Sequence, residues 1–188
     1  MNAQVKPRVT YAGYLEREAV SDVKHEFIAG ELFAMAGGTV EHGALAAAFI
    51  AQLGAALGGK PCRTFTSDVR VLVSSTDASF YPDVSVVCGT LETVTADANA
   101  ITNPVVLVEV LSDSTEGHDR GVKAAHYRRL PTLKEYVLVS QTERRVEVQR
   151  LNERGLWELH FFSAGQRIEL TSLGVSLSLD AVYANPLA

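Results

Sequence analysis

One charged residue interrupts an otherwise aliphatic run. Residues 105–111 read Val-Val-Leu-Val-Glu-Val-Leu, with Glu109 as the single charge. A run that is apolar on both faces is typical of a strand covered on both sides, so we expect this carboxylate to be buried. A buried carboxylate costs several kcal/mol unless a cation, a metal ion or a proton compensates it. A structural salt bridge and a catalytic site both meet that requirement.

A second carboxylate, Asp83, follows Tyr81 and Pro82 in the preceding β-rich run. Two carboxylates on neighbouring strands repel each other unless a cation lies between them. Hard oxygen ligands of this kind suit Mg²⁺, with Mn²⁺ as a substitute. No set of Cys and His residues at zinc-ligand spacing competes with them. Asp83 and Glu109 are therefore the predicted metal ligands.

Lys123 follows Glu109 by 14 residues, in a predicted helix that must cross back over the sheet. An ammonium group in that position could orient or deprotonate an attacking water, or neutralise a scissile phosphate as charge develops. The alternative is an i, i+4 ion pair with Asp119 on a solvated helix face. The spacing alone leaves both possibilities open.

The pattern of the chain predicts an α/β fold with a mixed β-sheet flanked by helices. Helices are expected over 11–20, 39–57 and 119–130, the last one ending before Pro131. Strands are expected over 64–74, 81–88, 105–111 and 135–140. An N-terminal hairpin is expected over 24–35, and a C-terminal β-hairpin over 144–162, followed by one short strand and a closing turn.

Length and charge limit the possible functions. The chain has 188 residues, 47% of them hydrophobic, and a net charge of −5. This length predicts one domain, 1–188, with a core over about 14–150. The acidic total argues against a protein that coats nucleic acid through its overall charge. However, nine acidic residues accompany one basic residue over 64–119, whereas nine basic residues accompany four acidic ones over 120–154. This polarity fits a metal site beside a phosphate-facing helix, or solvated faces of opposite sign.

Other features concern the compartment. Cys62 and Cys88 lie in apolar surroundings without a metal-ligand partner, which predicts buried free thiols in a reducing environment. Residues 1–10 lack the apolar segment of a secretory signal. The longest uncharged run, 43–59, is rich in Ala and Gly and falls short of the ~20 apolar residues that a membrane span needs. We therefore expect a cytoplasmic protein without a membrane segment.

Three motifs together resemble a known family. They read Tyr81-Pro82-Asp83, Glu109-Val110-Leu111-Ser112, and Asp119-Arg120-Gly121-Val122-Lys123 with Tyr127. Their order and spacing resemble the restriction-endonuclease group once catalogued as a domain of unknown function, within the PD-(D/E)XK nuclease superfamily. The resemblance extends to 24–32, 41–43 and 135–139. It implies a restriction-endonuclease-like core and Mg²⁺-dependent hydrolysis of DNA phosphodiester bonds.

The resemblance also assigns roles to single residues. Asp83 matches the aspartate of the PD motif, and Glu109 matches the acid of the third motif. The superfamily pattern places a lysine two residues after that acid, whereas this sequence has Leu111. In this group the lysine lies in the following helix, which indicates Lys123. Glu26 matches an early glutamate of the group, which makes it a further catalytic residue or metal ligand, ahead of Glu31 and Glu41.

The predicted function is therefore that of an Mg²⁺-dependent endonuclease. Arg120, Arg128 and Arg129 are expected to contact the DNA backbone. His42 is expected to face the site, although a capping or partly buried histidine would also explain it. A homodimer is expected, because a two-fold pair suits the cutting of both strands of a duplex, with the C-terminal hairpin as a plausible interface. The alternative is a DNA-binding or scaffold protein that keeps the nuclease fold without catalysis.

Overall fold

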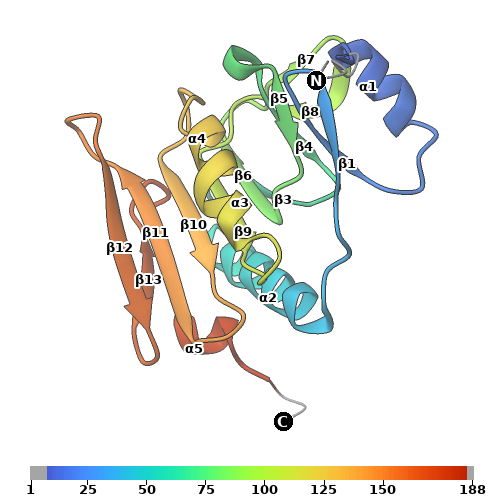
Figure 1. Ribbon diagram of the computed structural model, residues 1–188. Coiled ribbons are helices and arrows are strands. Elements are labelled where there is room, and N and C mark those ends of the chain that lie inside the picture. Colours follow the sequence, from blue (N-terminus) through green and yellow to red (C-terminus); the bar gives the residue numbers. More distant parts are fainter. Residues whose placement is uncertain (1–7, 186–188) are drawn as a thin grey trace.

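The computed structural model describes residues 8–185 and divides their strands among two large sheets and one small one (Figure 1). The N-terminal sheet has the order β2-β1-β5-β4-β8-β7 and consists of β1 (His25–Ile28), β2 (Glu31–Ala34), β4 (Arg70–Val73), β5 (Ala78–Phe80), β7 (Thr93–Val94) and β8 (Asp97–Ile101). The central sheet has the order β12-β11-β10-β9-β6-β3 and consists of β3 (Cys62–Thr66), β6 (Val84–Cys88), β9 (Val106–Val110), β10 (Glu135–Val139), β11 (Arg145–Leu151) and β12 (Trp157–Ser163). The small sheet pairs β13 (Arg167–Leu170) with β14 (Val175–Ser178).

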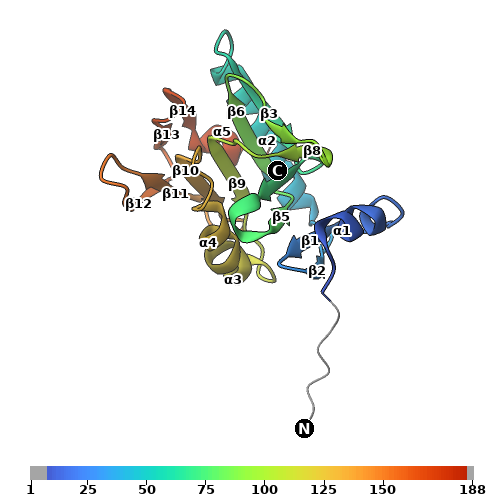
Figure 2. The same ribbon diagram turned by 90° about the horizontal axis from the view of Figure 1, so that it is seen from above.

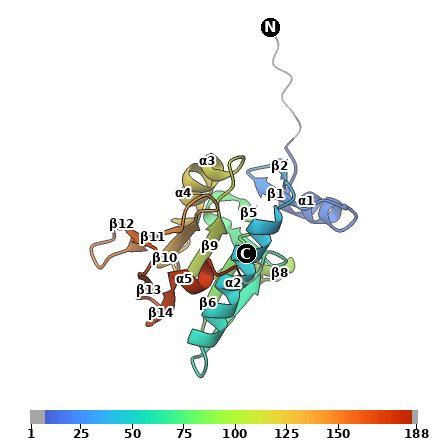
Figure 3. The ribbon, with the colours of Figure 1, turned by 90° about the horizontal axis from the view of Figure 1, so that it is seen from below.

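The helices are short apart from one. They are α1 (Tyr11–Glu18), α2 (Val40–Ala56), α3 (Glu116–His118), a π-helical turn η2 (Asp119–Lys123), α4 (Ala124–Tyr127), α5 (Leu179–Val182) and a 3-10 turn η1 (Ser74–Thr76). Figures 2 and 3 show β9 between α2 on one side and α3 with α4 on the other. The α/β class, the mixed sheets and both predicted hairpins, β1–β2 and β11–β12, are confirmed.

The alternation of side chains along β9 explains how Glu109 is oriented. Val106, Val108 and Val110 pack in the core that contains Leu45, Phe49 and Leu53 of α2. Leu107 and Leu111 pack in a second core, which contains Ala124 and Tyr127 of α4. Because successive strand residues point to opposite faces, Glu109 shares the α4 side with Leu107 and Leu111.

Helix α2 forms as its sequence predicts. The Thr39 side chain caps the helix by accepting a hydrogen bond from the His42 backbone N–H at 3.1 Å. Leu45, Phe49 and Leu53 recur at i, i+4 and are the buried residues of the helix. Thr39 therefore fixes the start of α2, and with it the position of His42.

The helix expected at 119–130 is irregular. It begins earlier, at Glu116, changes to a π-helical turn over Asp119–Lys123 and ends at Tyr127. Such turns interrupt α-helices mostly as single insertions and are frequent at functional sites. Asp119 and Lys123 are the buried residues of this turn, and the Tyr136 hydroxyl donates a hydrogen bond to the Asp119 carbonyl at 3.0 Å. The turn thus directs one acidic and one basic side chain inward.

Several predicted elements were wrong in detail. The strand expected at 64–74 is two strands, because the chain leaves the central sheet after Thr66, turns, and joins the N-terminal sheet at Arg70. The alternating Thr and Val residues hid that turn. The strands β7 and β8 were not predicted, and the C-terminal tail contains two strands and a short helix instead of one strand.

The prediction of free thiols was also wrong. Cys62 and Cys88 lie directly opposite each other in β3 and β6 and form a disulfide. A separation of 26 residues gives no indication of strand register, so the sequence did not reveal the pair. The cytoplasmic location stays a prediction, without the support of free thiols. Residues 1–7 of the segment considered as a secretory signal lie outside the described part of the chain. No helix within 8–185 is long and apolar enough to cross a membrane.

Candidate active site

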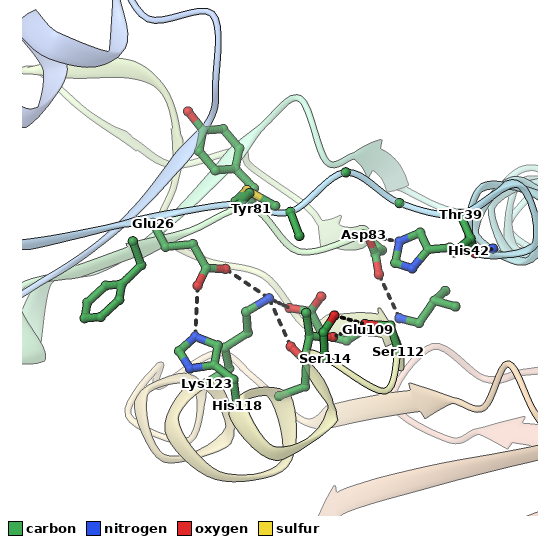
Figure 4. Close-up of a pocket in the computed structure, with 18 of the residues that line it drawn as sticks. Glu26, Thr39, His42, Tyr81, Asp83, Glu109, Ser112, Ser114, His118 and Lys123 are labelled. Carbon is green, nitrogen blue, oxygen red and sulfur yellow. Dashed lines mark hydrogen bonds and ion pairs between the residues drawn. The ribbon is translucent and has the colours of Figure 1, made fainter.

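A pocket of about 390 Å³ lies where the two large sheets meet the helices α2 and α3 (Figure 4). Acidic and basic side chains from five elements and from the segment before β6 line it: Glu26 of β1, His42 of α2, Asp83 before β6, Glu109 of β9, His118 of α3, and Asp119 and Lys123 of η2. The predicted acids and the predicted lysine are therefore brought together, although they are spread over 98 positions of the chain.

Lys123 is the centre of an ion cluster. Its Nζ lies 3.0 Å from Glu26 Oε1, 3.1 Å from Glu109 Oε1 and 3.1 Å from Asp119 Oδ1. Lys123 thus reaches Glu109 and also forms the i, i+4 pair with Asp119, whereas its role toward water or phosphate stays a prediction. The expectation of a solvated helix face is wrong, since the Lys123 side chain is only 7% exposed.

Glu109 is a deeply buried acid of the cluster, 3% exposed. Burial raises the pKa of Glu109 well above its ordinary value of 4.5, and the nearby Asp83, Asp119 and Glu26 raise it further, against the opposing charge of Lys123. Its Oε1 also accepts a hydrogen bond from the Tyr127 hydroxyl at 2.9 Å. The environment therefore favours a protonated or cation-bound Glu109.

Asp83 is held from two sides. The register of β6 with β9 pairs Val84 with Val108, so one step further along the ladder Asp83 lies opposite Glu109. Its Oδ2 accepts a hydrogen bond from the Val110 backbone N–H at 2.7 Å, and its Oδ1 lies 2.9 Å from His42 Nε2. The hydrogen bond with Asp83 raises the pKa of His42. Asp83 is thus fixed at the pocket wall by a backbone N–H and by a histidine whose pKa it raises.

Glu26 approaches the pocket from the N-terminal sheet. Its Oε2 lies 2.9 Å from His118 Nε2, and its Oε1 faces Lys123. Burial would raise the pKa of Glu26, but the hydrogen bond with His118 and the charge of Lys123 outweigh it and lower that pKa. Glu31 and Glu41, the poorer candidates, are exposed and do not line the pocket.

Leu111 shows why the lysine comes from a helix. Residues i and i+2 of a strand share a face, so a lysine at 111 would be expected on the same face as Glu109. Leu111 instead packs in the second core, 5% exposed, with Ala124 and Tyr127. The ammonium group reaches Glu109 from η2, across that core.

The basic residues expected to bind DNA do not line the pocket. Arg120 forms ion pairs with Glu116 and Glu147, its guanidinium lying 2.6 Å from Glu147 Oε2. Arg128 donates a hydrogen bond to Gln149 at 2.6 Å and stacks over Trp157. Arg129 is exposed at the end of α4. Among the predicted substrate contacts, His42 alone lines the pocket.

Two cluster members were missed as site residues. Asp119 was considered only as a surface partner of Lys123, and His118 was not among the predicted site residues. The sequence signal was present, because Asp119 and Lys123 are four positions apart and His118 precedes them. This spacing could not be interpreted without knowledge of the π-helical turn, which no residue pattern predicted.

The donors of the pocket fit a hard divalent cation. Glu26, Glu109 and Asp119 surround one ammonium group, so the buried cluster contains more potential negative than positive charge. No group of three or more His, Cys, Asp or Glu residues within 8–185 is arranged to hold a metal ion. Mg²⁺, however, is usually bound through one or two carboxylates and keeps several waters. Asp83 and Glu109, which lie opposite each other, meet that smaller requirement.

The fold is that of a nuclease-like α/β protein. A crystal structure described as "a putative nuclease belonging to DUF820", from Anabaena variabilis, matches with a TM-score of 0.71 over 87% of this chain and 91% of that one. The sequence identity is 18%, so this likeness concerns the fold.

The family is given by the sequence. A family model named Uma2, described as "Putative restriction endonuclease", matches residues 11–181. Two proteins of Synechocystis sp. PCC 6803 are similar to this chain. The uncharacterized protein slr1290 is 34% identical over 94% of this chain and 92% of its own length. The uncharacterized protein sll1609 is 36% identical over 78% of this chain and 83% of its own length. The chain therefore belongs to the Uma2 family of restriction-endonuclease-like proteins, as its motifs predicted.

Proposed function

We propose that this protein is a divalent-metal-dependent endonuclease that hydrolyses phosphodiester bonds of DNA, with Mg²⁺ as the cofactor. The observation that carries the proposal is the acid excess in the pocket. Asp83 comes directly before β6 and lies opposite Glu109 of the neighbouring strand β9, and Lys123 contacts Glu109 at 3.1 Å within a buried site. Membership in a nuclease-like family supports the reaction class.

Asp83 and Glu109 would hold the cation, with Glu26 as a further acid at the pocket wall. When bound, Mg²⁺ would lower the pKa of a water and stabilise the charge that develops on the scissile phosphate. The Val110 backbone N–H and His42 fix the Asp83 carboxylate before any ligand arrives. This preorganisation keeps the metal-binding oxygens in place at little cost when the ligand binds.

Lys123 acts as a donor in this proposal. Burial alone would lower the pKa of Lys123, but Glu109, Glu26 and Asp119 raise it above its ordinary value. A raised pKa disfavours loss of the ammonium proton, so in this proposal Lys123 orients the attacking water or stabilises the phosphate charge and does not act as the general base. This choice between the two roles rests on the three carboxylates around it.

In this proposal the exposed Arg129 can contact the DNA backbone directly. Arg120 and Arg128 already have protein partners, so their contact with phosphates would require an exchange of those partners. His42 lines the pocket, and its raised pKa favours a cation that would face an incoming phosphate. Metal-free affinity for DNA should therefore be weak and should fall with salt.

One observation favours the second candidate function, a DNA-binding or scaffold protein without catalysis. The three carboxylates around Lys123 already have a cation, and within 8–185 no three-residue metal group exists. If Lys123 compensated the site fully, no metal would bind. Calorimetric titration with Mn²⁺ separates the two functions, because only an active site should bind the ion and lose it in Glu109→Gln.

The test of the proposed function is a plasmid-nicking assay with Mg²⁺ and with Mn²⁺. Asp83→Asn, Glu109→Gln and Lys123→Met should each remove cleavage while the circular dichroism spectrum is retained. Glu41→Gln is the matched control, since Glu41 is an exposed acid outside the pocket, and it should cleave like the wild type. A wild type that cuts no DNA with either metal would overturn the proposal.

A further inference from the structure

The strand β12 is a free edge of the central sheet, and its exposed side chains are strongly apolar. It is the terminal strand in the order β12-β11-β10-β9-β6-β3, and Figure 1 shows it at the left margin with no strand beyond it. Trp157, Leu159 and Phe161 alternate along one face, and Leu159 and Phe161 are 51% and 56% exposed. Side chains of this kind on an edge strand favour pairing with another strand.

The usual protection of edge strands is missing from β12. Prolines, lysines and β-bulges normally block the pairing of an edge with another chain. The strand reads Trp-Glu-Leu-His-Phe-Phe-Ser and contains neither Pro nor Lys. It pairs with β11 over all 7 of its residues in one unbroken register, without a bulge. A regular, apolar edge of this length is a template for strand addition.

We propose that the occupant of this edge is a second copy of the chain, paired antiparallel to β12 about a two-fold axis at Leu159. An axis perpendicular to the sheet keeps each face on its own side and pairs residues symmetrically about the centre. Trp157 then lies opposite Phe161 of the second copy, and Leu159 opposite its own counterpart. Aromatic and aliphatic pairs of this kind stabilise a sheet.

Charge complementarity selects this register. With the axis at Leu159, Glu158 lies opposite His160 of the second copy, and the same pair forms twice. Within one chain His160 Nε2 is buried and lies 3.8 Å from Glu158 Oε2, whereas the His160 side chain as a whole is 35% exposed and that of Glu158 is 54% exposed. The exposed part of the imidazole, and not its buried Nε2, is therefore what Glu158 of the second copy would contact. An axis at His160 would instead oppose two histidines and place Glu158 against Phe162. With the axis at Leu159, apolar residues pair on one face of the strand and Glu158 pairs with His160 on the other.

The dimer edge and the candidate active site are separate. Two strands, β10 and β11, lie between β12 and β9, which carries Glu109. The inference therefore does not rest on the proposed function. It gives the expected homodimer a particular surface, and it leaves each copy with its own complete pocket.

Engineered cysteines test the register. Residues directly opposite in an antiparallel pair have Cα atoms about 4.5–5.5 Å apart, within the range that a disulfide spans. Both native cysteines are in a disulfide, so Leu159→Cys would supply the only free thiol. Mild oxidation should convert Leu159→Cys to a covalent dimer on a non-reducing gel. Glu158→Cys is the matched control, because its counterpart is two positions out of register and beyond bridging distance.

Sedimentation tests the association itself. The wild type should sediment as a dimer, about twice the 20.3 kDa of one chain. Phe161→Lys should sediment as a monomer, whereas Val20→Lys, which alters an 87% exposed residue of another surface, should remain dimeric. A wild type that is monomeric at every concentration, or crosslinking in His160→Cys but not in Leu159→Cys, would overturn the proposal. Nicking by Phe161→Lys reports on the pocket separately, so failure of the dimer and failure of the nuclease are distinguishable.

Discussion

Two glutamates in neighbouring strands of the central sheet are equally buried but differ in their surroundings. Glu109 of β9 is 3% exposed and Glu135 of β10 is 0% exposed. Glu135 accepts hydrogen bonds from Arg150, from the backbone N–H groups of Thr171 and Ser172, and from the Ser172 hydroxyl. Both of its oxygens are thus occupied by donors of the protein.

Glu109 has a different set of neighbours. It faces a pocket, shares Lys123 with two other acids, and lies opposite Asp83. The pKa of Glu109 is raised chiefly by burial. Burial of a carboxylate therefore does not by itself mark a functional residue. What distinguishes Glu109 is that protein donors compensate it incompletely and that a ligand can reach it.

The largest expected effect is a loss of stability when Glu135 is replaced. Glu135→Gln should lower the free energy of unfolding by about 3–5 kcal/mol, because it removes the charge of a fully buried acid and leaves the partly buried Arg150 without its charged partner. Nicking activity of the folded fraction should be close to that of the wild type. Urea denaturation and the nicking assay at low temperature provide the two measurements. A Glu135→Gln protein that is stable but inactive would contradict the structural role.

Glu109→Gln should show the opposite pattern. Cleavage should fall by ~10²- to 10³-fold or more, the size found when one group that stabilises developing charge is removed. Stability should change little or increase, because the substitution removes one of three acids around a single ammonium. Single-turnover cleavage rates and denaturation curves measure both. Equal losses of stability in Glu109→Gln and Glu135→Gln would remove the distinction between the two sites.

Metal binding distinguishes Glu109 from other acids in an experiment that needs no DNA. A ligand present at a hundred times its dissociation constant stabilises a protein by about 2.7 kcal/mol. Mn²⁺ should therefore raise the melting temperature of the wild type by several degrees and that of Glu109→Gln by much less. Glu41→Gln should respond like the wild type. An equal shift in all three proteins would place the bound ion outside the pocket.

The smallest expected effect concerns pH. A carboxyl whose pKa is raised by folding is protonated in both states below its ordinary value of 4.5, and the stability that it contributes there is lost as pH rises through its folded pKa. Without metal, the unfolding free energy of the wild type should fall relative to Glu109→Gln as pH rises from 4.5 through that raised value. Denaturation midpoints over a pH series measure the difference. A difference that grows toward acid pH would contradict the raised pKa.

Much of the site could be predicted because its residues contradict their local pattern. Glu109 is the only charge in an aliphatic run. The superfamily pattern expects a lysine at position 111, where this sequence has Leu111, and the lysine was therefore sought in the following helix, at Lys123. Glu26 came only from the family resemblance, since nothing in 24–32 marks it as buried. Asp119 and His118 could not be assigned, because their orientation depends on a π-helical turn.

The limits of the fold prediction have a similar cause. Strands with long aliphatic runs, such as β9 and β10, were predictable from composition alone. The turn after Thr66 was not, because the residues around it keep a strand-like alternation while the chain passes from one sheet to another. The disulfide was missed for the same reason, since Cys62 and Cys88 meet only through strand register.

The π-helical turn makes the chemistry of the pocket depend on a count of residues. Each residue of an α-helix advances the side chains by about 100° around the axis. Deleting Gly121 would allow an ordinary α-helix over this segment, and it would reduce the separation of Asp119 and His118 from Lys123 from four and five positions to three and four. Every side chain of the cluster would still be present in the chain, but the i, i+4 relation of Lys123 with Asp119 would be lost. The candidate active site is thus specified by the length of one helical segment as much as by its composition.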